Sequence, residues 1–186
     1  MVARLRRRFP IGKEARADFH YVGVHVRCKH GENGYLEEIL VDQEDFVDEL
    51  GLLSENKGVK QETAHRDAVG SLLWASSTTR TDLALDVALL SGATSSPTLG
   101  DFVPANKTVK RAKCAHVTLR YPRVRGPLHL VGYSDAAWAN LSDGKTGGGV
   151  FICLADGNGR SGGETFWPIC WPARRLKRVV HSMFAS

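Results

Sequence analysis

The most constraining part of the sequence is residues 128–154, where an alternating segment ends in an aspartate and an apolar segment follows. Alternate side chains of a strand point to the same face, so the pattern predicts one shared face for His129, Val131, Tyr133 and Asp135. A polar loop separates this strand from a second, buried strand expected at 148–154. We therefore predict a hairpin with Asp135 at the end of its first strand. These residues alone also fit an ordinary hairpin whose aspartate starts a turn.

Length and composition set the broad class of protein. The chain has 186 residues, of which 42% are hydrophobic, and this is typical of one globular domain or two small ones. No run of about 18 apolar residues occurs, so we expect no membrane span. The first residues are charged and lack an apolar core, so they do not predict a secretory signal. We expect an intracellular protein, in the cytoplasm or the nucleus.

The cysteines give little sign of disulfides or structural zinc. Four cysteines lie far apart in the sequence, and free thiols in a reducing compartment are expected. Cys28 with His30, and Cys114 with His116, have the spacing of half a zinc site. Structural zinc uses a matched second pair, and neither half-site has one. We expect no zinc at these cysteines.

Charge is distributed unevenly along the chain, with a formal net charge of +5. Basic residues gather at 1–16, 107–125 and 174–178, whereas 36–49 is acidic. Separate basic clusters on a folded body favour a polyanionic partner such as nucleic acid. A solvated surface that only keeps the protein soluble explains the same pattern.

The first third of the chain predicts a β-hairpin and a short helix. Residues 1–12 resemble a helix end stopped by Pro10 and Gly12, and residues 19–28 alternate as one strand. A turn at 31–34 leads into a returning strand at 35–41. Asp42 is positioned to cap a short helix. The inward-facing residues of that helix are Phe46, Val47 and Leu50, and a linker follows at 54–60.

Three helices are expected next. The first starts at Gln61 and buries Ala64, Ala68, Val69, Leu72, Leu73, Trp74 and Ala75. Thr81 or Asp82 caps the second, whose inner face holds Leu83, Val87 and Leu90; a loop follows at 91–97. The third spans 101–119, with Phe102, Ala105, Val109, Ala112, His116 and Leu119 inward. Lys107, Lys110 and Arg111 then lie on its outer face, where they suit phosphates or water.

The final segment predicts a strand and a helix. Residues 165–171 read as a third strand, and Pro168 favours an edge position because it cannot donate a ladder hydrogen bond. A helix is expected from Arg174 to Ser186. The predicted fold class is α+β: a β-hairpin, a helical segment, and an incomplete sheet of three antiparallel strands.

Several motifs in order resemble the Pol proteins of copia-type LTR retrotransposons. The segments 133–139 and 143–151, Tyr-Ser-Asp-Ala-Ala-Trp-Ala and Asp-Gly-Lys-Thr-Gly-Gly-Gly-Val-Phe, resemble the opening of the RNase H domain in these proteins. Residues 66–121 resemble the region between polymerase and RNase H, with Thr81 where the family pattern has proline. Residues 5–47 resemble the end of the reverse transcriptase. The resemblance covers nearly the whole chain.

The resemblance implies a division into three parts and a set of nucleic-acid contacts. Residues 1–53 would be the end of the reverse transcriptase palm, 54–126 the thumb and connection, and 127–186 the start of an RNase H-like domain. Tyr21, Val22 and Gly23 match a hairpin that holds the primer strand. The implied and charge-based nucleic-acid-binding residues together are Tyr21, Gly23, Arg6, Arg7, Lys107, Lys110 and Arg111.

The resemblance also implies a chemistry. Complete proteins of this family copy RNA into DNA and degrade RNA in RNA–DNA hybrids, using Mg²⁺ held by several carboxylates. Asp135 matches the first catalytic, metal-binding aspartate of RNase H. A glutamate would follow Ser186 directly, and the polymerase acids would precede this chain, so we expect the chain alone to be inactive.

Two hypotheses about function remain open. The chain is either an enzyme component whose other acids come from a partner chain or a continuation, or a non-catalytic nucleic-acid-binding remnant. The partner in both cases is an RNA–DNA hybrid or another nucleic acid. We also expect self-association, because the strand carrying Asp135 would lack its family partner and expose an unpaired edge.

Overall fold

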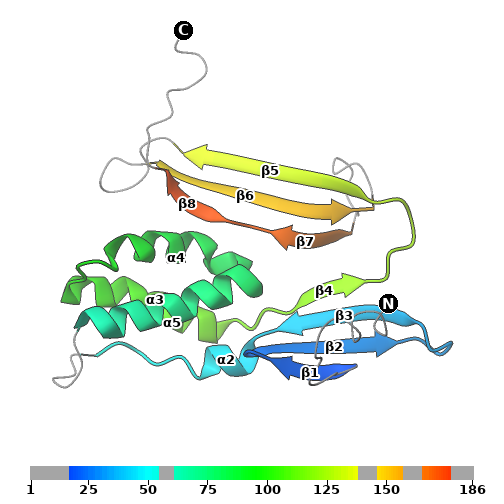
Figure 1. Ribbon diagram of the computed structural model, residues 1–186, viewed down its shortest axis with the longest axis horizontal. Coiled ribbons are helices and arrows are strands. Elements are labelled where there is room, and N and C mark those ends of the chain that lie inside the picture. Colours follow the sequence, from blue (N-terminus) through cyan, green and yellow to red (C-terminus); the bar gives the residue numbers. More distant parts are fainter. Residues whose placement is uncertain (1–16, 55–60, 138–145, 157–164, 177–186) are drawn as a thin grey trace, which may run out of the picture.

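The computed structural model describes residues 17–54, 61–137, 146–156 and 165–176. It is an α+β structure in which a four-stranded antiparallel sheet is followed by helices and then by a second antiparallel sheet (Figure 1). The coarse prediction of fold class is therefore confirmed. Among the described residues, no helix has both the length and the apolar character needed to cross a membrane.

The first sheet has the order β1-β2-β3-β4. Its strands are β1 Asp18–Tyr21, β2 Val24–His30, β3 Leu36–Asp42 and β4 Leu119–Pro122. The turn predicted at 31–34 is confirmed, but the single strand predicted at 19–28 is wrong. The chain reverses at Val22 and Gly23, whose φ angles of 49° and 75° are those of a tight hairpin turn, so the segment forms two paired strands.

The helical layer holds the main core. Its elements are α2 Glu44–Asp48, α3 Gln61–Thr78, η1 Thr81–Leu83, α4 Ala84–Leu90, η2 Ser91–Ala93 and α5 Leu99–Cys114. The buried core residues are Val47, Val69, Leu72, Ala75, Leu83, Val87, Leu90, Ala105, Val109 and Ala112, with Phe46, Leu50 and Leu53 packed against them. All but Leu53 were predicted to be buried.

The buried stripe of α3 differs from the predicted one. Leu73 and Trp74 are 52% and 38% exposed, whereas His65 is fully buried and stacks on Phe102 at 6.3 Å between ring centroids. Residues one helical turn apart share a face, and the turn before Val69 and Leu72 places His65 rather than Ala64 on the buried face. At the C-terminal end, the predicted stripe was too wide because it included Leu73 and Trp74.

The predicted helix caps and one helix boundary are corrected. Asp42 belongs to β3, where its buried carboxylate pairs with Arg27, and Gln43 precedes α2. Neither Thr81 nor Asp82 caps α4, because both lie in the 3₁₀ turn η1.

Helix α5 starts earlier than predicted and also ends earlier. It begins at Leu99, where Thr98 and Asp101 form a capping box. It ends at Cys114, because Ala115 is extended. His116 therefore lies beyond the helix, and Leu119 enters β4 and pairs with Val41.

The second sheet pairs β5 His129–Ala137 with β6 Thr146–Ala155, and β6 with both β7 Phe166–Cys170 and β8 Ala173–Leu176. The two predicted strands at 148–154 and 165–171 are present, with Pro168 on the edge strand β7. Burial is only partial: Cys153 is buried but Val150 is 40% exposed. The start of the predicted helix at Arg174 is wrong, since β8 continues the sheet there. Residues 177–186 lie outside the described part.

Within the described chain, β5 pairs only with β6 and forms a sheet edge. Leu130 and Tyr133 on this strand are 71% and 46% exposed. The edge is of the kind that supports pairing with another chain. Self-association remains a prediction.

Side-chain donors from other elements reach the C-terminal ends of three helices. The last carbonyls of a helix have no partner within it. Lys113 donates to the carbonyl of Asp48 in α2, the indole of Trp171 to that of Ser76 in α3, and Arg80 to that of Ala112 in α5. Through Trp171 the second sheet is joined to the helical layer. Trp167 and Tyr121 join it to β4 through hydrogen bonds of 2.8 and 3.1 Å with the carbonyls of Pro122 and Pro168.

Candidate nucleic-acid interface

The turn between β1 and β2 presents an aromatic side chain to solvent on a fixed backbone. Tyr21 and Val22 are 70% and 64% exposed. The carbonyl of Val22 accepts a hydrogen bond of 3.2 Å from the indole of Trp74 in α3. A Cβ on Gly23 would come within 3.0 Å of Phe46, and its φ is +75°, so glycine is required here. Val22 has a positive φ that β-branched residues rarely adopt, a strain typical of functional turns.

The three predicted cations of α5 are exposed opposite the core, but they are not equivalent. Arg111 forms an ion pair of 2.8 Å with Asp86 of α4. Lys107 and Lys110 form no ion pair with any residue that the structure describes. Lys107 and Arg111 border a groove of about 290 Å³ between α4 and α5. Two of the three predicted cations are therefore exposed with no ion-pair partner among the described residues.

The basic residues at 120–125 are engaged by the acidic segment of β3. Arg120 lies 2.7 Å from Glu38, and Arg123 and Arg125 lie 3.2 and 3.3 Å from Glu37. The hydrogen bond from Arg120 is the main reason that the pKa of Glu38 is below its usual range. The pairing of β3 with β4 brings these charges together, so this basic cluster offers less free charge than its sequence indicates.

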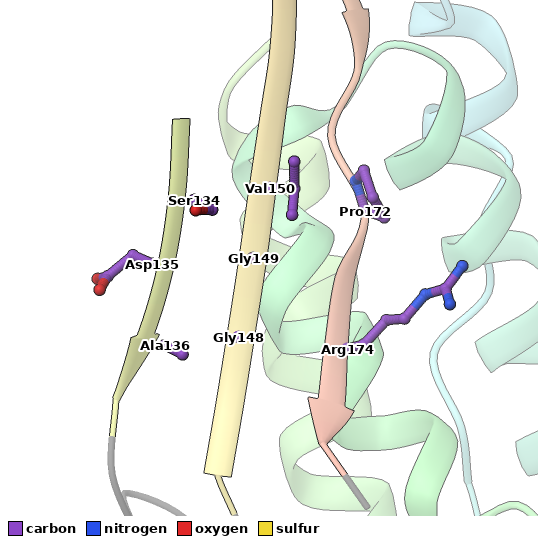
Figure 2. Close-up of a pocket in the computed structure, with 8 residues that line it drawn as sticks. All are labelled: Ser134, Asp135, Ala136, Gly148, Gly149, Val150, Pro172 and Arg174. Atoms are coloured by element: carbon purple, nitrogen blue, oxygen red, sulfur yellow. The ribbon is translucent and has the colours of Figure 1, made fainter. Parts of the chain in front are cut away.

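Asp135 is exposed on β5 beside a strip of β6 that lacks side chains. It lies opposite Gly149 in the pair, and Gly147 and Gly148 continue the strip. Glycine inside a strand leaves room for another backbone to approach closely. A groove of about 500 Å³ lies over the opposite face of these strands, and the Asp135 carboxylate points away from it (Figure 2). The side chains that border the groove are Ser134, Ala136, Val150, Pro172 and Arg174.

The nearest cation of this groove does not face Asp135. Asp135, Gly149 and Ala173 lie across from one another and share one face of the sheet, whereas Arg174 lies opposite Gly148 on the other face. Figure 2 shows the Asp135 and Arg174 side chains pointing in opposite directions. The carboxylate of Asp135 is therefore available to solvent or to a ligand.

The described residues do not surround Asp135 with other metal ligands. No group of three candidate ligands in residues 17–54, 61–137, 146–156 and 165–176 includes it. The same holds for the half-sites of Cys28 and Cys114, and all four cysteines are free. One group of this kind does occur, at Asp18, His20 and His25, which the sequence reasoning missed.

The predicted binding residues that the structure describes lie in three places: the β1–β2 turn, the outer face of α5, and β5. The predicted residues Arg6 and Arg7 lie outside the described residues. Comparisons of the chain with protein-family models, with curated proteins and with solved structures found no match.

Proposed function

We propose that this chain is a nucleic-acid-binding part of a Pol protein of the copia-type LTR retrotransposon kind. Its three parts would be the end of the reverse transcriptase at 1–53, the thumb and connection at 54–126, and the start of an RNase H-like domain at 127–186. The observation that carries the proposal is the exposed Asp135 beside the glycine strip of β6. Such a strip lets a sugar–phosphate backbone come close to a carboxylate on the first strand of a sheet.

The proposed ligand is an RNA–DNA hybrid bound without sequence preference. Exposed cations and an exposed aromatic ring support this proposal. Lys107 and Lys110 are exposed and form no ion pair among the described residues, and the ring of Tyr21 is exposed. Phosphate contacts hold a duplex without reading its bases. An aromatic ring can stack on any base at a frayed end or in a single strand.

We expect hybrid binding to weaken with salt. Each phosphate contact contributes about −0.9 to the slope of log association constant against log salt concentration for B-form duplex. Lys110→Ala should make that negative slope shallower by about 0.9, measured by fluorescence anisotropy of a labelled hybrid. Lys29→Ala is the matched control: it removes the same charge, but Lys29 is engaged by Glu38 at 3.2 Å, so the slope should not change. Equal slopes for the two variants would contradict the role of α5.

We expect no cleavage of the hybrid by this chain in Mg²⁺ or Mn²⁺. Two-metal hydrolysis needs one ion to activate water and another to stabilise the leaving oxygen, with carboxylates bridging both. Among the described residues, no group of three candidate metal ligands includes Asp135. Asp135→Asn should retain hybrid binding and show the same lack of cleavage in a gel assay with labelled RNA.

The alternative proposal is an enzyme component that obtains further carboxylates from another chain. Cleavage by the 186-residue chain that disappears in Asp135→Asn would favour this alternative. Cleavage that survives Asp135→Asn would contradict both, because the activity would then belong to another site.

A further inference from the structure

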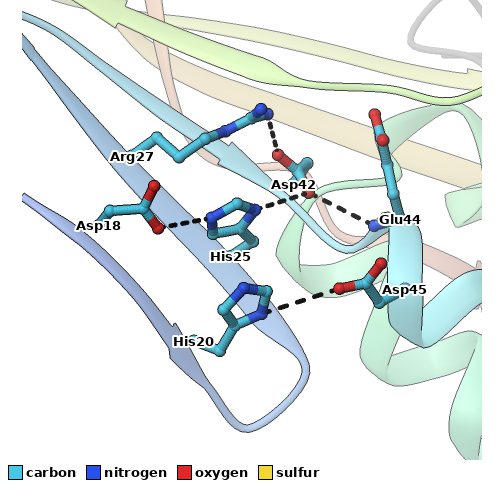
Figure 3. Close-up of polar contacts among 7 residues, drawn as sticks. All are labelled: Asp18, His20, His25, Arg27, Asp42, Glu44 and Asp45. Carbon is cyan, nitrogen blue, oxygen red and sulfur yellow. Dashed lines mark hydrogen bonds and ion pairs between the residues drawn. The ribbon is translucent and has the colours of Figure 1, made fainter.

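The β1–β2 hairpin carries a cluster of imidazole and carboxylate groups that the proposed function does not use. The register places His20 directly opposite His25, and Asp18 lies on the same face of β1 as His20. His25 Nε2 lies 2.8 Å from Asp18 Oδ1, and the two imidazole rings stack with centroids 4.1 Å apart. One ligand atom from each of the three residues lies within 4.8 Å of the other two. Figure 3 shows the three side chains together on the hairpin.

A further carboxylate lies near each imidazole, at ion-pair distance but beyond hydrogen-bond distance. His25 Nδ1 lies 4.0 Å from Oδ1 of Asp42, a carboxylate that is buried and also held by Arg27. His20 Nδ1 lies 3.9 Å from Oδ2 of Asp45. Each ring therefore has one nitrogen near an outer carboxylate and the other available to the cluster (Figure 3). Metal-binding histidines commonly have such a carboxylate beside the nitrogen that does not bind the metal.

We propose that Asp18, His20 and His25 bind a divalent zinc-class ion. Two imidazole nitrogens and one carboxylate oxygen are ligands that Zn²⁺ accepts, whereas Mg²⁺ and Ca²⁺ prefer oxygen alone. Three protein ligands leave one tetrahedral position for water or for a ligand. The ion would replace the hydrogen-bonded proton between His25 and Asp18.

The approach to the site is open, but the exposed His20 ring must turn out of its stack on His25 before both rings can bind one ion. Each nitrogen lone pair lies in the plane of its ring, and the two ring planes are only 13° from parallel. Bonds of about 2.0–2.1 Å place tetrahedral ligand atoms about 3.3–3.5 Å apart. The cluster is already within 4.8 Å, so rotation of the outer side chains closes it. The Asp18 and His20 side chains are 67% and 57% exposed and can make that rotation, while His25 at 23% is held by its neighbours.

Zinc titration of the complete chain tests the proposal. With Zn²⁺ alone as the probe, calorimetry should show one ion bound per chain. His20→Gln and His25→Gln should each weaken binding by about tenfold or more. His30→Gln is the control, because His30 is also on β2 but lies outside the cluster, and its affinity should be unchanged. Absence of saturable binding, or equal weakening by His30→Gln, would overturn the proposal.

A second measurement works even if a variant fails to fold. Co²⁺ bound to the unaltered chain should give the intense visible absorption of a tetrahedral site, and Zn²⁺ should displace it. No thiolate-to-cobalt band should appear in the near ultraviolet. Such a band would assign the ion to an exposed cysteine, Cys114 or Cys170, and would overturn the site at the hairpin.

Discussion

Replacing Arg80 with methionine should lower the free energy of unfolding by about 1–3 kcal/mol, the usual cost of leaving a buried hydrogen-bonding group without its partner. Arg80 is 2% exposed although it lies in the polar break between α3 and α4. It donates two hydrogen bonds of 2.9 Å to Asp82, and a third to the carbonyl of Ala112 near the end of α5. Methionine fills much of the same volume but leaves the carboxylate and the carbonyl without their donor.

The effect of Arg80→Met should depend on pH through Asp82. Burial tends to raise the pKa of the Asp82 carboxyl, but hydrogen bonds from Arg80 and its charge outweigh burial and keep the pKa below its usual value. A lowered folded-state pKa adds stability above the unfolded pKa of about 3.9, and this stability is lost as pH falls through the folded value. The cost of the substitution should therefore shrink below about pH 4.

Urea unfolding at pH 7 and pH 3 measures both expectations for Arg80. The control is Arg66→Met, since Arg66 is exposed on α3. Its effect should stay within about 0.5 kcal/mol. A cost for Arg80→Met that is equal at the two pH values would show that Asp82 is not the partner that matters.

Leu72→Ala should destabilise the chain by about 2–5 kcal/mol, because it removes a fully buried side chain from the centre of the helical core and leaves a cavity. The adjacent Leu73 is 52% exposed and gives a matched control of the same chemistry. Leu73→Ala should cost much less, since exposed substitutions usually stay near 0.5 kcal/mol. Similar losses for both variants in urea unfolding would contradict the orientation of α3.

The helices were predictable because their apolar residues repeat with the helical period. Val87 and Leu90 of α4 are buried together with Leu83 at the end of η1, as expected, and so are Ala105 and Val109 of α5. The pattern carried no information on where α5 stops. Leu119 continues the helical period but belongs to β4. Its strand was missed because four residues are too few to show a strand pattern in the sequence.

The cluster of Asp18, His20 and His25 was missed because the sequence reads as one strand where the structure has a hairpin. In one continuous strand, residues 20 and 25 point to opposite faces because they are an odd number apart. The turn at Val22 and Gly23 reverses the chain and places His20 opposite His25. A Gly preceded by a β-branched residue is a weak turn signal, so the alternation on both sides read as one strand.

The charge pairs were also hidden, because they join distant parts of the chain. Glu37 and Glu38 meet Arg120, Arg123 and Arg125 through the pairing of β3 with β4. Arg80 likewise gave no local sign of burial. Long-range contacts of this type depend on the arrangement of elements, which residue patterns along the chain do not contain.

The donors at the helix ends have a consequence for how the chain folds. Arg80, Lys113 and Trp171 reach carbonyls that are 32, 65 and 95 residues away in sequence. The hydrogen bonds of the final turn of each helix are therefore complete only when a segment distant in sequence has packed against it. The chain must lose the entropy of closing those loops before these hydrogen bonds can form. Contacts of such long range slow folding and couple the parts to one another. We expect the last turn of α3 to open together with β7 and β8 rather than with its own first turns.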